Sequence, residues 1–134
     1  MVAARPIPTP DPESQAFWTG GAKGELLLMQ CRDCATFIHP PRHVCRNCLS
    51  EHVEPQAVRG TGTVETFTIN HQKWLPGLEV PYVIARVSLD GAPEVILTTN
   101  IVGCPVDAVD IGDRVRVVFE DHGEVFVPVF EKLR

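Results

Sequence analysis

Cys31-Arg32-Asp33-Cys34 and Cys45-Arg46-Asn47-Cys48 are two C-x2-C pairs separated by ten residues. Four thiolates in two such pairs can close a tetrahedral site around Zn²⁺, with Zn–S distances of about 2.3 Å. The ten residues between the pairs allow a short strand and a return through Pro40-Pro41. A finger of this size buries almost no core, so metal binding must supply its folding free energy. The spacing therefore predicts a zinc ribbon rather than two disulfides or four unrelated cysteines.

The predicted metal site has a structural role, because four sulfurs fill a tetrahedron and leave no position for water. The ligands are Cys31, Cys34, Cys45 and Cys48. His39 and His43 lie inside the finger and could each replace a thiolate, but with four cysteines available we expect both at the surface. Iron in a rubredoxin-like site is the alternative metal, and spacing leaves both ions open.

Length and composition favour a small intracellular protein. A chain of 134 residues suits one compact domain, or a small domain with a metal-stabilised appendage. No apolar run approaches a membrane span, and residues 1–8 lack the apolar core of a signal peptide. Cysteines in metal-binding spacing fit a reducing compartment better than a disulfide framework. We expect a cytoplasmic protein outside the membrane, with the fifth cysteine, Cys104, as a small buried apolar residue.

The charge is concentrated in one half of the chain. Residues 1–60 hold six Lys/Arg and six Asp/Glu, whereas residues 61–134 hold six and eleven, so the net charge of −5 lies in the second half. A nucleic-acid-binding protein normally presents a basic stripe to phosphates. The acidic second half argues against that function.

The N-terminal region predicts a loose arm and one short helix. Residues 1–10 contain three prolines and need no regular structure. Asp11 as N-cap and Pro12 at the first helical position favour a helix that carries Phe17 and Trp18 and ends at Gly20-Gly21. A strand over Glu25–Gln30 then leads into the first cysteine pair.

The residues after the finger predict strands. Val53–Arg59 leads through Gly60 into short strands rich in Val, Ile and Phe, bounded by turn signals such as Asp90-Gly91. Such a series suggests a closed antiparallel barrel or a small sandwich, and the short Pro105–Val109 connection favours a five-stranded OB barrel. The five expected strands are Thr63–His71, Tyr82–Leu89, Val95–Ile101, Arg114–Glu120 and Val125–Phe130.

The order of these parts resembles a known family. The N-terminal half of the resemblance comprises Phe17-Trp18, Gly24-Glu25-Leu26-Leu27, the two cysteine pairs and Pro40-Pro41-Arg42. The second half comprises Gly60–Val64, Pro81–Ala85, Leu89-Asp90-Gly91 and Ile111–Val115. The chain is similar to the acyl-CoA-associated zinc-ribbon/OB-fold family, domain of unknown function thirty-five, from about Phe17 to its end. Apart from the two cysteine pairs, each of these motifs is too common to identify the family by itself. Their order along the chain is what makes the resemblance specific.

The resemblance implies a mainly β fold: an N-terminal helix and a rubredoxin-like zinc ribbon, followed by a five-stranded antiparallel OB-fold barrel. The expected boundaries are 1–24 for the arm and helix, 25–55 for the ribbon and 56–134 for the barrel. It also implies a non-catalytic accessory subunit that docks on a thiolase-like enzyme and helps to bind or channel an acyl-CoA thioester. Settings for such complexes include acyl transfer and thiolytic or retro-aldol (aldolase) degradation of lipid or steroid side chains.

Two surfaces are candidates for these contacts. The long segment His71–Pro81 carries Lys73 and Trp74, which with Phe17 and Trp18 could anchor a partner; each tryptophan could instead pack on its own chain. Arginine binds phosphates with two parallel hydrogen bonds, so Arg42 and Arg46 are candidates for coenzyme A. His71 is a weak candidate for a general base because no second polar group is assigned to orient it.

Two other function classes remain as alternatives. A nucleic-acid-binding OB/zinc-ribbon module would need exposed aromatic residues beside basic ones, whereas most aromatic residues of the barrel are expected in its core. A small stand-alone enzyme would need a catalytic constellation, and the sequence offers no nucleophile–base pair and no phosphate loop. Both alternatives are therefore disfavoured relative to the accessory subunit.

Overall fold

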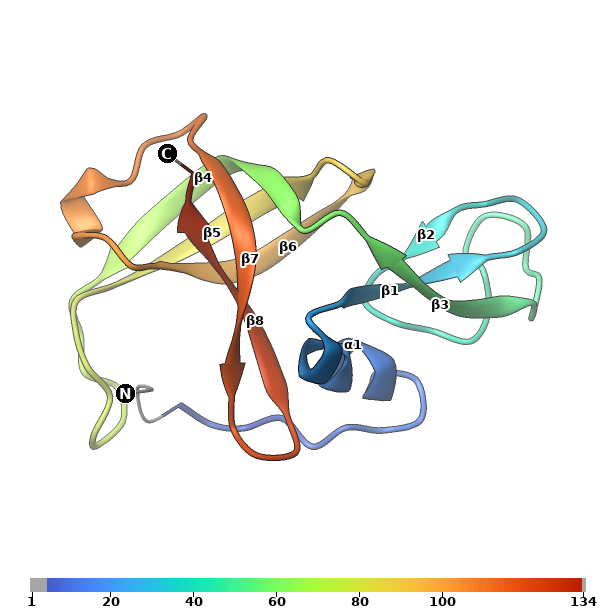
Figure 1. Ribbon diagram of the computed structural model, residues 1–134, viewed down its shortest axis with the longest axis horizontal. Helices are drawn as coiled ribbons and strands as arrows, with labels where there is room; N and C mark the ends of the chain where they lie inside the picture. Colours follow the sequence, from blue (N-terminus) through green and yellow to red (C-terminus); the bar gives the residue numbers. More distant parts are fainter. Residues whose placement is uncertain (1–4, 134) are drawn as a thin grey trace.

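The computed structural model describes residues 5–133 and divides into a ribbon lobe and a barrel lobe (Figure 1). Strands β1 to β3 form the ribbon lobe, β4 to β8 form the barrel, and helix α1 lies between them. In chain order the elements are α1 (Gln15–Thr19), the 3₁₀ helix η1 (Gly20–Lys23), β1 (Leu26–Cys31), β2 (Phe37–Ile38), β3 (Val53–Val58), β4 (Thr61–Asn70), β5 (Tyr82–Leu89), β6 (Ala92–Val102), the 3₁₀ helix η2 (Val106–Ala108), β7 (Arg114–Asp121) and β8 (Phe126–Lys132).

The second half of the chain closes into a five-stranded barrel with the order β4-β5-β6-β8-β7. The predicted fold class, mainly β with a zinc ribbon and an OB barrel, is confirmed. One pairing differs from the antiparallel expectation: β6 and β8 run parallel through Ile101↔Phe130 and Val102↔Glu131. This pair closes the barrel between strands that are not consecutive in the chain, so no hairpin constrains its direction.

Alternation along β5 and β6 separates the barrel core from an outer face. Val83, Ala85, Val87 and Leu89 of β5 are buried, whereas Ile84, Arg86 and Ser88 point outward. Strand β6 behaves in the same way, with a period of two. The outer face of these strands therefore presents Ile84, Arg86, Ile96, Thr98 and Asn100 side by side.

Strand β1 belongs to both lobes. Its Leu26 and Leu28 lie in the barrel core, whereas Met29 and Cys31 lie in a separate ribbon core. Among the described residues, the buried ones in that second core are Met29, Cys31, Ile38 and Cys45, with Cys34 and Val53 packed against them. Half of the ribbon core is thus supplied by cysteine, and a chain with so few apolar groups needs another source of stability.

Helix α1 starts after a turn that Asp11 caps. The Asp11 carboxylate accepts the Ser14 amide at 2.8 Å, and the Ser14 hydroxyl accepts the Asp11 amide at 3.1 Å. The Ser14 side-chain hydrogen bond lowers the pKa of Asp11. The regular helix therefore begins at Gln15, later than the capping residue suggested. It gives way to η1 at Gly20-Gly21, where a Cβ on Gly21 would lie 2.5 Å from Phe126 Cβ, so only glycine allows this contact with the barrel.

The arm before the helix is anchored at its first described residue. The Arg5 side chain donates to the Asn100 side-chain amide oxygen at 2.9 Å, and its Nε lies 2.8 Å from Glu120 Oε1. The arm passes the turn of the β7–β8 hairpin (Figure 1). The expectation of a loose arm over residues 1–10 is thus wrong at Arg5, because a carboxylate on β7 pairs with it; residues 1–4 lie outside the described residues. No helix between residues 5 and 133 is long and apolar enough to cross a membrane.

Candidate metal centre and ligand groove

The four predicted ligands converge at one point in the ribbon. The sulfurs of Cys31, Cys34, Cys45 and Cys48 all lie within 4.8 Å of one another. The Cys31–Cys48 and Cys34–Cys45 sulfur pairs are each 3.6 Å apart. A tetrahedron with Zn–S bonds of about 2.3 Å has edges of about 3.8 Å, so the sulfurs fit this ion with little movement.

Each cysteine pair forms the same knuckle. The residue after each pair, Ala35 or Leu49, has a left-handed backbone with φ of 65° or 64°, and its amide donates to the carbonyl of the first cysteine at 2.9 Å. Left-handed geometry costs a non-glycine residue about 1 kcal/mol or more. The strain recurs at equivalent positions of both pairs, which indicates a shape maintained for metal binding.

Hydrogen bonds to the Cys34 sulfur favour its thiolate form. The Thr36 hydroxyl, 3.1 Å from Cys34 Sγ, and then the Asn47 amide at 3.6 Å lower the pKa of Cys34 to about 6. The Asn47 backbone amide also donates to Cys45 Sγ at 3.3 Å. Because a metal binds thiolates rather than thiols, these contacts prepare the site for an ion. Four sulfurs complete its coordination, so the chemistry of the donor set is structural.

A polar cluster joins the two knuckles outside the sulfurs. The Asp33 carboxylate accepts the Ser50 hydroxyl and lies 3.1 Å from His52 Nδ1. The Ser50 hydrogen bond, followed by the one from His52, lowers the pKa of Asp33. The Ser50 hydroxyl contacts the carboxylate and the His52 backbone amide but not the His52 ring, so the cluster lacks the order of a nucleophile–base relay.

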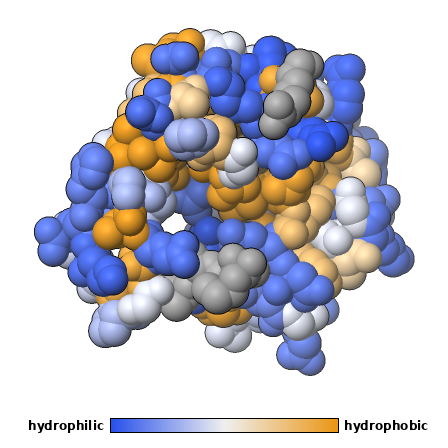
Figure 2. All heavy atoms as spheres, turned by 60° about the vertical axis from the view of Figure 1, so that its left-hand side comes forward, coloured by the Kyte–Doolittle hydropathy of each residue, from blue (hydrophilic) through white to orange (hydrophobic). Residues whose placement is uncertain are grey.

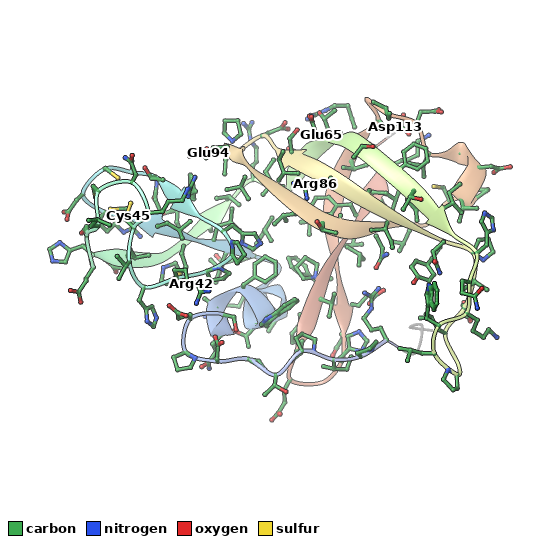
Figure 3. The ribbon with its side chains drawn as sticks, turned by 180° about the vertical axis from the view of Figure 1, so that it is seen from behind. Arg42, Cys45, Glu65, Arg86, Glu94 and Asp113 are labelled. Carbon is green, nitrogen blue, oxygen red and sulfur yellow. The ribbon has the colours of Figure 1, made fainter. Side chains whose placement is uncertain are left out.

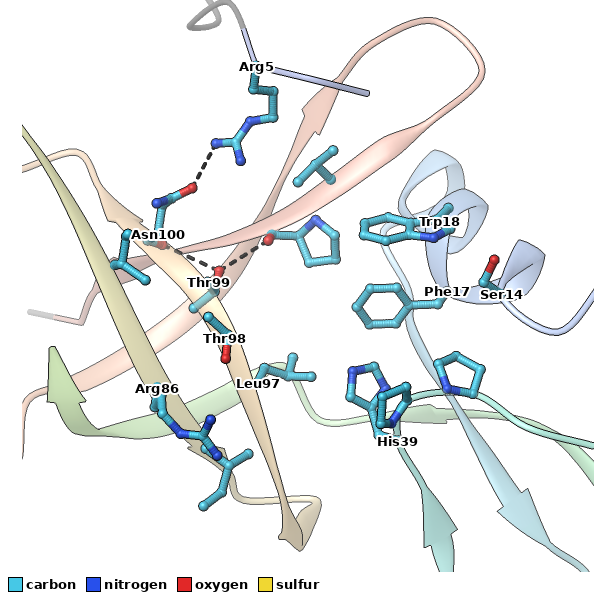
Figure 4. Close-up of a pocket in the computed structure, with 16 residues that line it drawn as sticks. Arg5, Ser14, Phe17, Trp18, His39, Arg86, Leu97, Thr98, Thr99 and Asn100 are labelled. Carbon is cyan, nitrogen blue, oxygen red and sulfur yellow. Dashed lines mark hydrogen bonds between the residues drawn. The ribbon is translucent and has the colours of Figure 1, made fainter. Parts of the chain in front are cut away.

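A groove of about 720 Å³ lies between the ribbon, helix α1 and the outer face of the barrel (Figure 4). Its floor is formed by the outward residues of β5 and β6, and its walls by α1, the segment after β2 and part of β8. Most of the lining is apolar, and the polar groups within it are Arg5, Ser14, His39, Arg86, Thr98, Thr99 and Asn100. A pocket of this size and composition is typical of sites for extended organic ligands.

None of these polar residues was assigned to a groove from sequence, and three of them carry ionisable side chains. Arg5 holds the arm, Arg86 projects from β5, and His39 follows β2. The expectation that His39 lies at the surface is wrong: its ring is largely buried, with its centroid 5.0 Å from that of Phe17. Burial lowers the pKa of His39. His43, in contrast, is exposed as expected.

Arg42 and Arg46 lie on the exposed ribbon surface and do not line the groove. Arg42 Nη1 is 3.4 Å from the Glu13 carboxylate, and Arg46 Nη1 donates to the Phe37 carbonyl at 2.8 Å. Figure 3 labels Arg42 on the ribbon side and Arg86 on the barrel. The assignment of coenzyme A to Arg42 and Arg46 stays a prediction.

Phe17 and Trp18 contact their own chain. Their rings meet edge to face with centroids 4.9 Å apart. Phe17 packs against the barrel core, and Trp18 packs against a cluster of Val125, Val127 and Val129. Both therefore join the helix to the barrel, and partner docking through them remains a prediction.

The loop between β4 and β5 carries the other docking candidates. Trp74 is 70% exposed, and its indole N–H donates to the Asn70 side chain at 3.1 Å. Lys73 and His71 are exposed beside it. Trp74 and Leu75 border a second groove of about 770 Å³, which Cys104 also lines. The space-filling view of this side shows a hollow with apolar surface on its rim (Figure 2).

Two family descriptions match consecutive parts of the chain. Residues 18–54 match the ChsH2 rubredoxin-like zinc ribbon domain, and residues 55–120 match the ChsH2 C-terminal OB-fold domain. The chain is also similar over 93% of its length to a chain in a solved structure titled "Ltp2-ChsH2(DUF35) aldolase", with 31% identity, a TM-score of 0.82 and 98% of that chain covered. A DUF35 protein of Sulfolobus solfataricus shares the fold at 17% identity and a TM-score of 0.64, covering 91% of this chain and 86% of that one.

Three curated relatives extend the comparison. A probable enoyl-CoA hydratase alpha subunit of Thermomonospora curvata is 36% identical over 96% of this chain and 40% of its own length. A 3-oxo-4,17-pregnadiene-20-carboxyl-CoA hydratase alpha subunit of Mycobacterium tuberculosis is 30% identical over 85% of this chain and 36% of its own length. A DUF35 domain-containing scaffold protein of Methanothermobacter thermautotrophicus is 29% identical over 70% of this chain and 71% of its own length. The chain thus spans well under half the length of the two hydratase subunits.

Proposed function

Because this chain belongs to the ChsH2 zinc-ribbon and OB-fold family, which is also the DUF35 family, we propose that it is an accessory subunit of a thiolase-like enzyme that acts on acyl-CoA thioesters. One observation carries the proposal: the chain matches 98% of a chain in a complex titled as an aldolase. A relative titled as a scaffold protein supports an assembly role. Two further relatives are named as alpha subunits, a word for one part of a complex.

We propose that the chain supplies no catalytic group itself. The four-sulfur site leaves no coordination position for substrate or water. Within residues 5–133, no serine or cysteine outside the metal site is hydrogen-bonded to a histidine ring, as an activated nucleophile would be. The partner would therefore perform the bond cleavage, and this chain would hold or cover the thioester.

The metal we propose is structural Zn²⁺, bound by the four cysteines. The sulfur spacing, the thiolate-favouring contacts and the matched zinc ribbon family support it. Bound at this place, the ion would fix the ribbon against the barrel. Elemental analysis would distinguish zinc from iron.

Partner docking is proposed at the Trp74 loop. Trp74 and Leu75 are 70% and 42% exposed, which is unusual for large apolar side chains in neighbouring positions. Exposed apolar groups at one place mark interaction sites, and tryptophan is enriched among interface hot spots. Lys73 would lie at the polar rim of such an interface.

Co-purification tests the proposed assembly. A tagged copy of the chain, expressed in its native host, is expected to retain one companion in fixed stoichiometry, identified by mass spectrometry as a thiolase-like enzyme. The Trp74→Ala variant serves as the matched control and should lose that companion. Recovery of nucleic acid instead, or a companion retained equally by the variant, would contradict the proposal.

A further inference from the structure

We propose that the groove beside the Trp74 loop receives a basic side chain, arginine or lysine, carried on an apolar segment of the partner enzyme. The inference rests on the proposed function, which assigns partner docking to this loop, and it adds the chemistry of the segment that binds there. The groove is the second one described above, of about 770 Å³, and its lining comes from the N-terminal arm, the loop and η2 regions and strands β5 to β8.

The floor of this groove belongs to an apolar surface on the outside of the barrel. Val129 is buried there, although Phe130, its neighbour in β8, fills the barrel core from the opposite face. Val102 and Val118, on the strands beside β8, pack against the same outer cluster. Trp18 covers one part of this cluster, and the three valines Val102, Val118 and Val129 extend from it into the groove. The groove is therefore the open part of an apolar surface that the chain itself covers elsewhere.

The rim of the groove adds aromatic and aliphatic side chains. Trp74 and Leu75 border it from the loop, and Tyr82 borders it from the start of β5. Contiguous exposed apolar surface marks a place where another protein binds. The faces of aromatic rings also attract ammonium and guanidinium groups through their quadrupole. A segment that buries the apolar floor can therefore bring a cation against the rings of the rim.

The charged groups of the groove are mainly acidic. Its lining includes the carboxylates of Glu79, Glu120 and Asp121 and, among the described residues, one cation, Arg5. Arg5 pairs with Glu120, whose carboxylate also lies 3.3 Å from His122 Nε2. Glu79 and Asp121 are exposed, and neither forms an ion pair within residues 5–133. The groove therefore keeps an excess of negative charge, which is complementary to a basic group on a partner.

The N-terminal arm shows how this surface accepts a cation. Besides pairing with Glu120, the Arg5 guanidinium donates to the Asn100 side chain (Figure 4), and Pro6 lines the same groove. The side chains of the Arg5–Glu120 pair are only 23% and 16% exposed, so the pair is largely withdrawn from water. A cation beside an apolar residue is thus already one occupant of this surface. A partner segment of the same chemistry would use the two carboxylates that Arg5 leaves unpaired.

Affinity for the co-purified companion, measured by calorimetry with the full chain, tests the role of the charges. In the double variant Glu79→Gln/Asp121→Asn each carboxylate becomes an amide of the same shape. We expect this variant to bind the companion more weakly by about tenfold or more, at an unchanged melting temperature. Glu94→Gln is the matched control, because Glu94 is an exposed carboxylate of β6 outside the groove (Figure 3), and it should bind normally. Wild-type affinity in the double variant, or an equal loss in Glu94→Gln, would overturn the inference.

A blocked leucine–arginine–leucine tripeptide tests the groove without the companion. At millimolar concentration the peptide is expected to shift the indole N–H resonance of Trp74, identified by its loss in Trp74→Ala, and to leave that of Trp18 in place. The citrulline analogue has nearly the same shape but no charge and should cause a much smaller shift, as should the arginine peptide added to the double variant. No shift with the arginine peptide, or an equal shift with the citrulline peptide, would overturn the assignment of a cation.

The two measurements separate this inference from the proposed function. A companion that Trp74→Ala loses and the double variant retains at full affinity would support docking at the loop and refute the basic segment. A charge-dependent peptide shift in a chain that retains no companion in its host would support the chemistry of the groove and contradict the proposed function.

Discussion

The two tryptophans lie in opposite environments, so substitution of each one distinguishes partner docking from internal packing. Trp74 is 70% exposed, whereas Trp18 packs against the valines of β8. Trp74→Ala is expected to weaken the complex by about 2 kcal/mol, roughly thirty-fold in Kd, at an unchanged melting temperature. Co-elution and thermal melting on the same protein sample measure the two effects.

Trp18→Ala is the matched variant. It removes a partly buried indole from the cluster of Val125, Val127 and Val129, so unfolding should become easier by about 2 kcal/mol. The melting temperature is expected to fall by several degrees, and a loss of partner affinity in the folded variant would assign Trp18 to the docking surface as well. A lowered melting temperature for Trp74→Ala, with normal partner affinity, would assign that residue to packing instead.

Asp90 links the barrel strands through its charge. The Arg114 guanidinium and then the Thr61 hydroxyl hold the pKa of Asp90 well below its ordinary value of 3.8. A carboxyl with a depressed folded-state pKa stabilises the fold above its unfolded-state pKa, and this contribution is lost as the pH falls through the folded-state value. Asp90→Asn should therefore be less stable than the wild type at neutral pH, and the difference should shrink as the pH falls below about 4.

Urea unfolding of both proteins between pH 7 and pH 3 measures this difference. The comparison at each pH cancels changes that affect both proteins, such as protonation of the cysteines. A difference that stays constant over the whole range would exclude a role for the Asp90 charge.

The residues of the candidate site were predicted from sequence to different degrees. The cysteines could be found because their spacing alone brings each pair together in a knuckle. Arg86 could not, since its lack of a counter-charge depends on which residues of β4 and β6 lie opposite it. Arg42 and Arg46 look equally available in the sequence, yet one pairs with Glu13 and the other with a carbonyl.

Among the elements, the ribbon should depend on its metal and the barrel should not. The ribbon core holds four buried residues, two of them cysteines, whereas the barrel core holds fourteen. Chelation or Cys34→Ser is expected to unfold the ribbon, residues 25–55 as bounded from the sequence, and to leave most of the barrel folded. Leu26 and Leu28 are part of the barrel core, so we expect the loss of protection to be strongest from Met29 onward.

Amide hydrogen exchange before and after chelation follows each strand separately. Loss of protection in β2 and in the outer part of β1 and β3, with β5 and β6 still protected, is the expected pattern. An ordered ribbon in protein that elemental analysis finds free of metal would contradict it.

Element positions followed the sequence pattern, but two details needed the three-dimensional structure. The expected third barrel strand, Val95–Ile101, extends over Ala92–Val102 as β6, because a register shift near Leu89 lets pairing continue into the turn. The parallel β6–β8 contact depends on barrel closure, which no local pattern encodes. Periodicity predicts which residues face the core, and topology decides which strands become neighbours.

The whole molecule provides a feature that neither lobe has alone. The ribbon contributes His39, the barrel contributes Arg86, and α1 contributes Phe17 to the same groove. The docking of the two lobes, through the shared strand β1, creates the groove.

Turnover by the reconstituted complex tests the central claim, that this chain assists a partner and does not catalyse. Cleavage of the partner's acyl-CoA thioester is measured with the purified companion alone, this chain alone and the two together. We predict no turnover by this chain, little by the companion, and a large increase for the pair that Trp74→Ala diminishes. Thioester cleavage by this chain alone that persists through rigorous purification, or a companion fully active without it, would contradict the account.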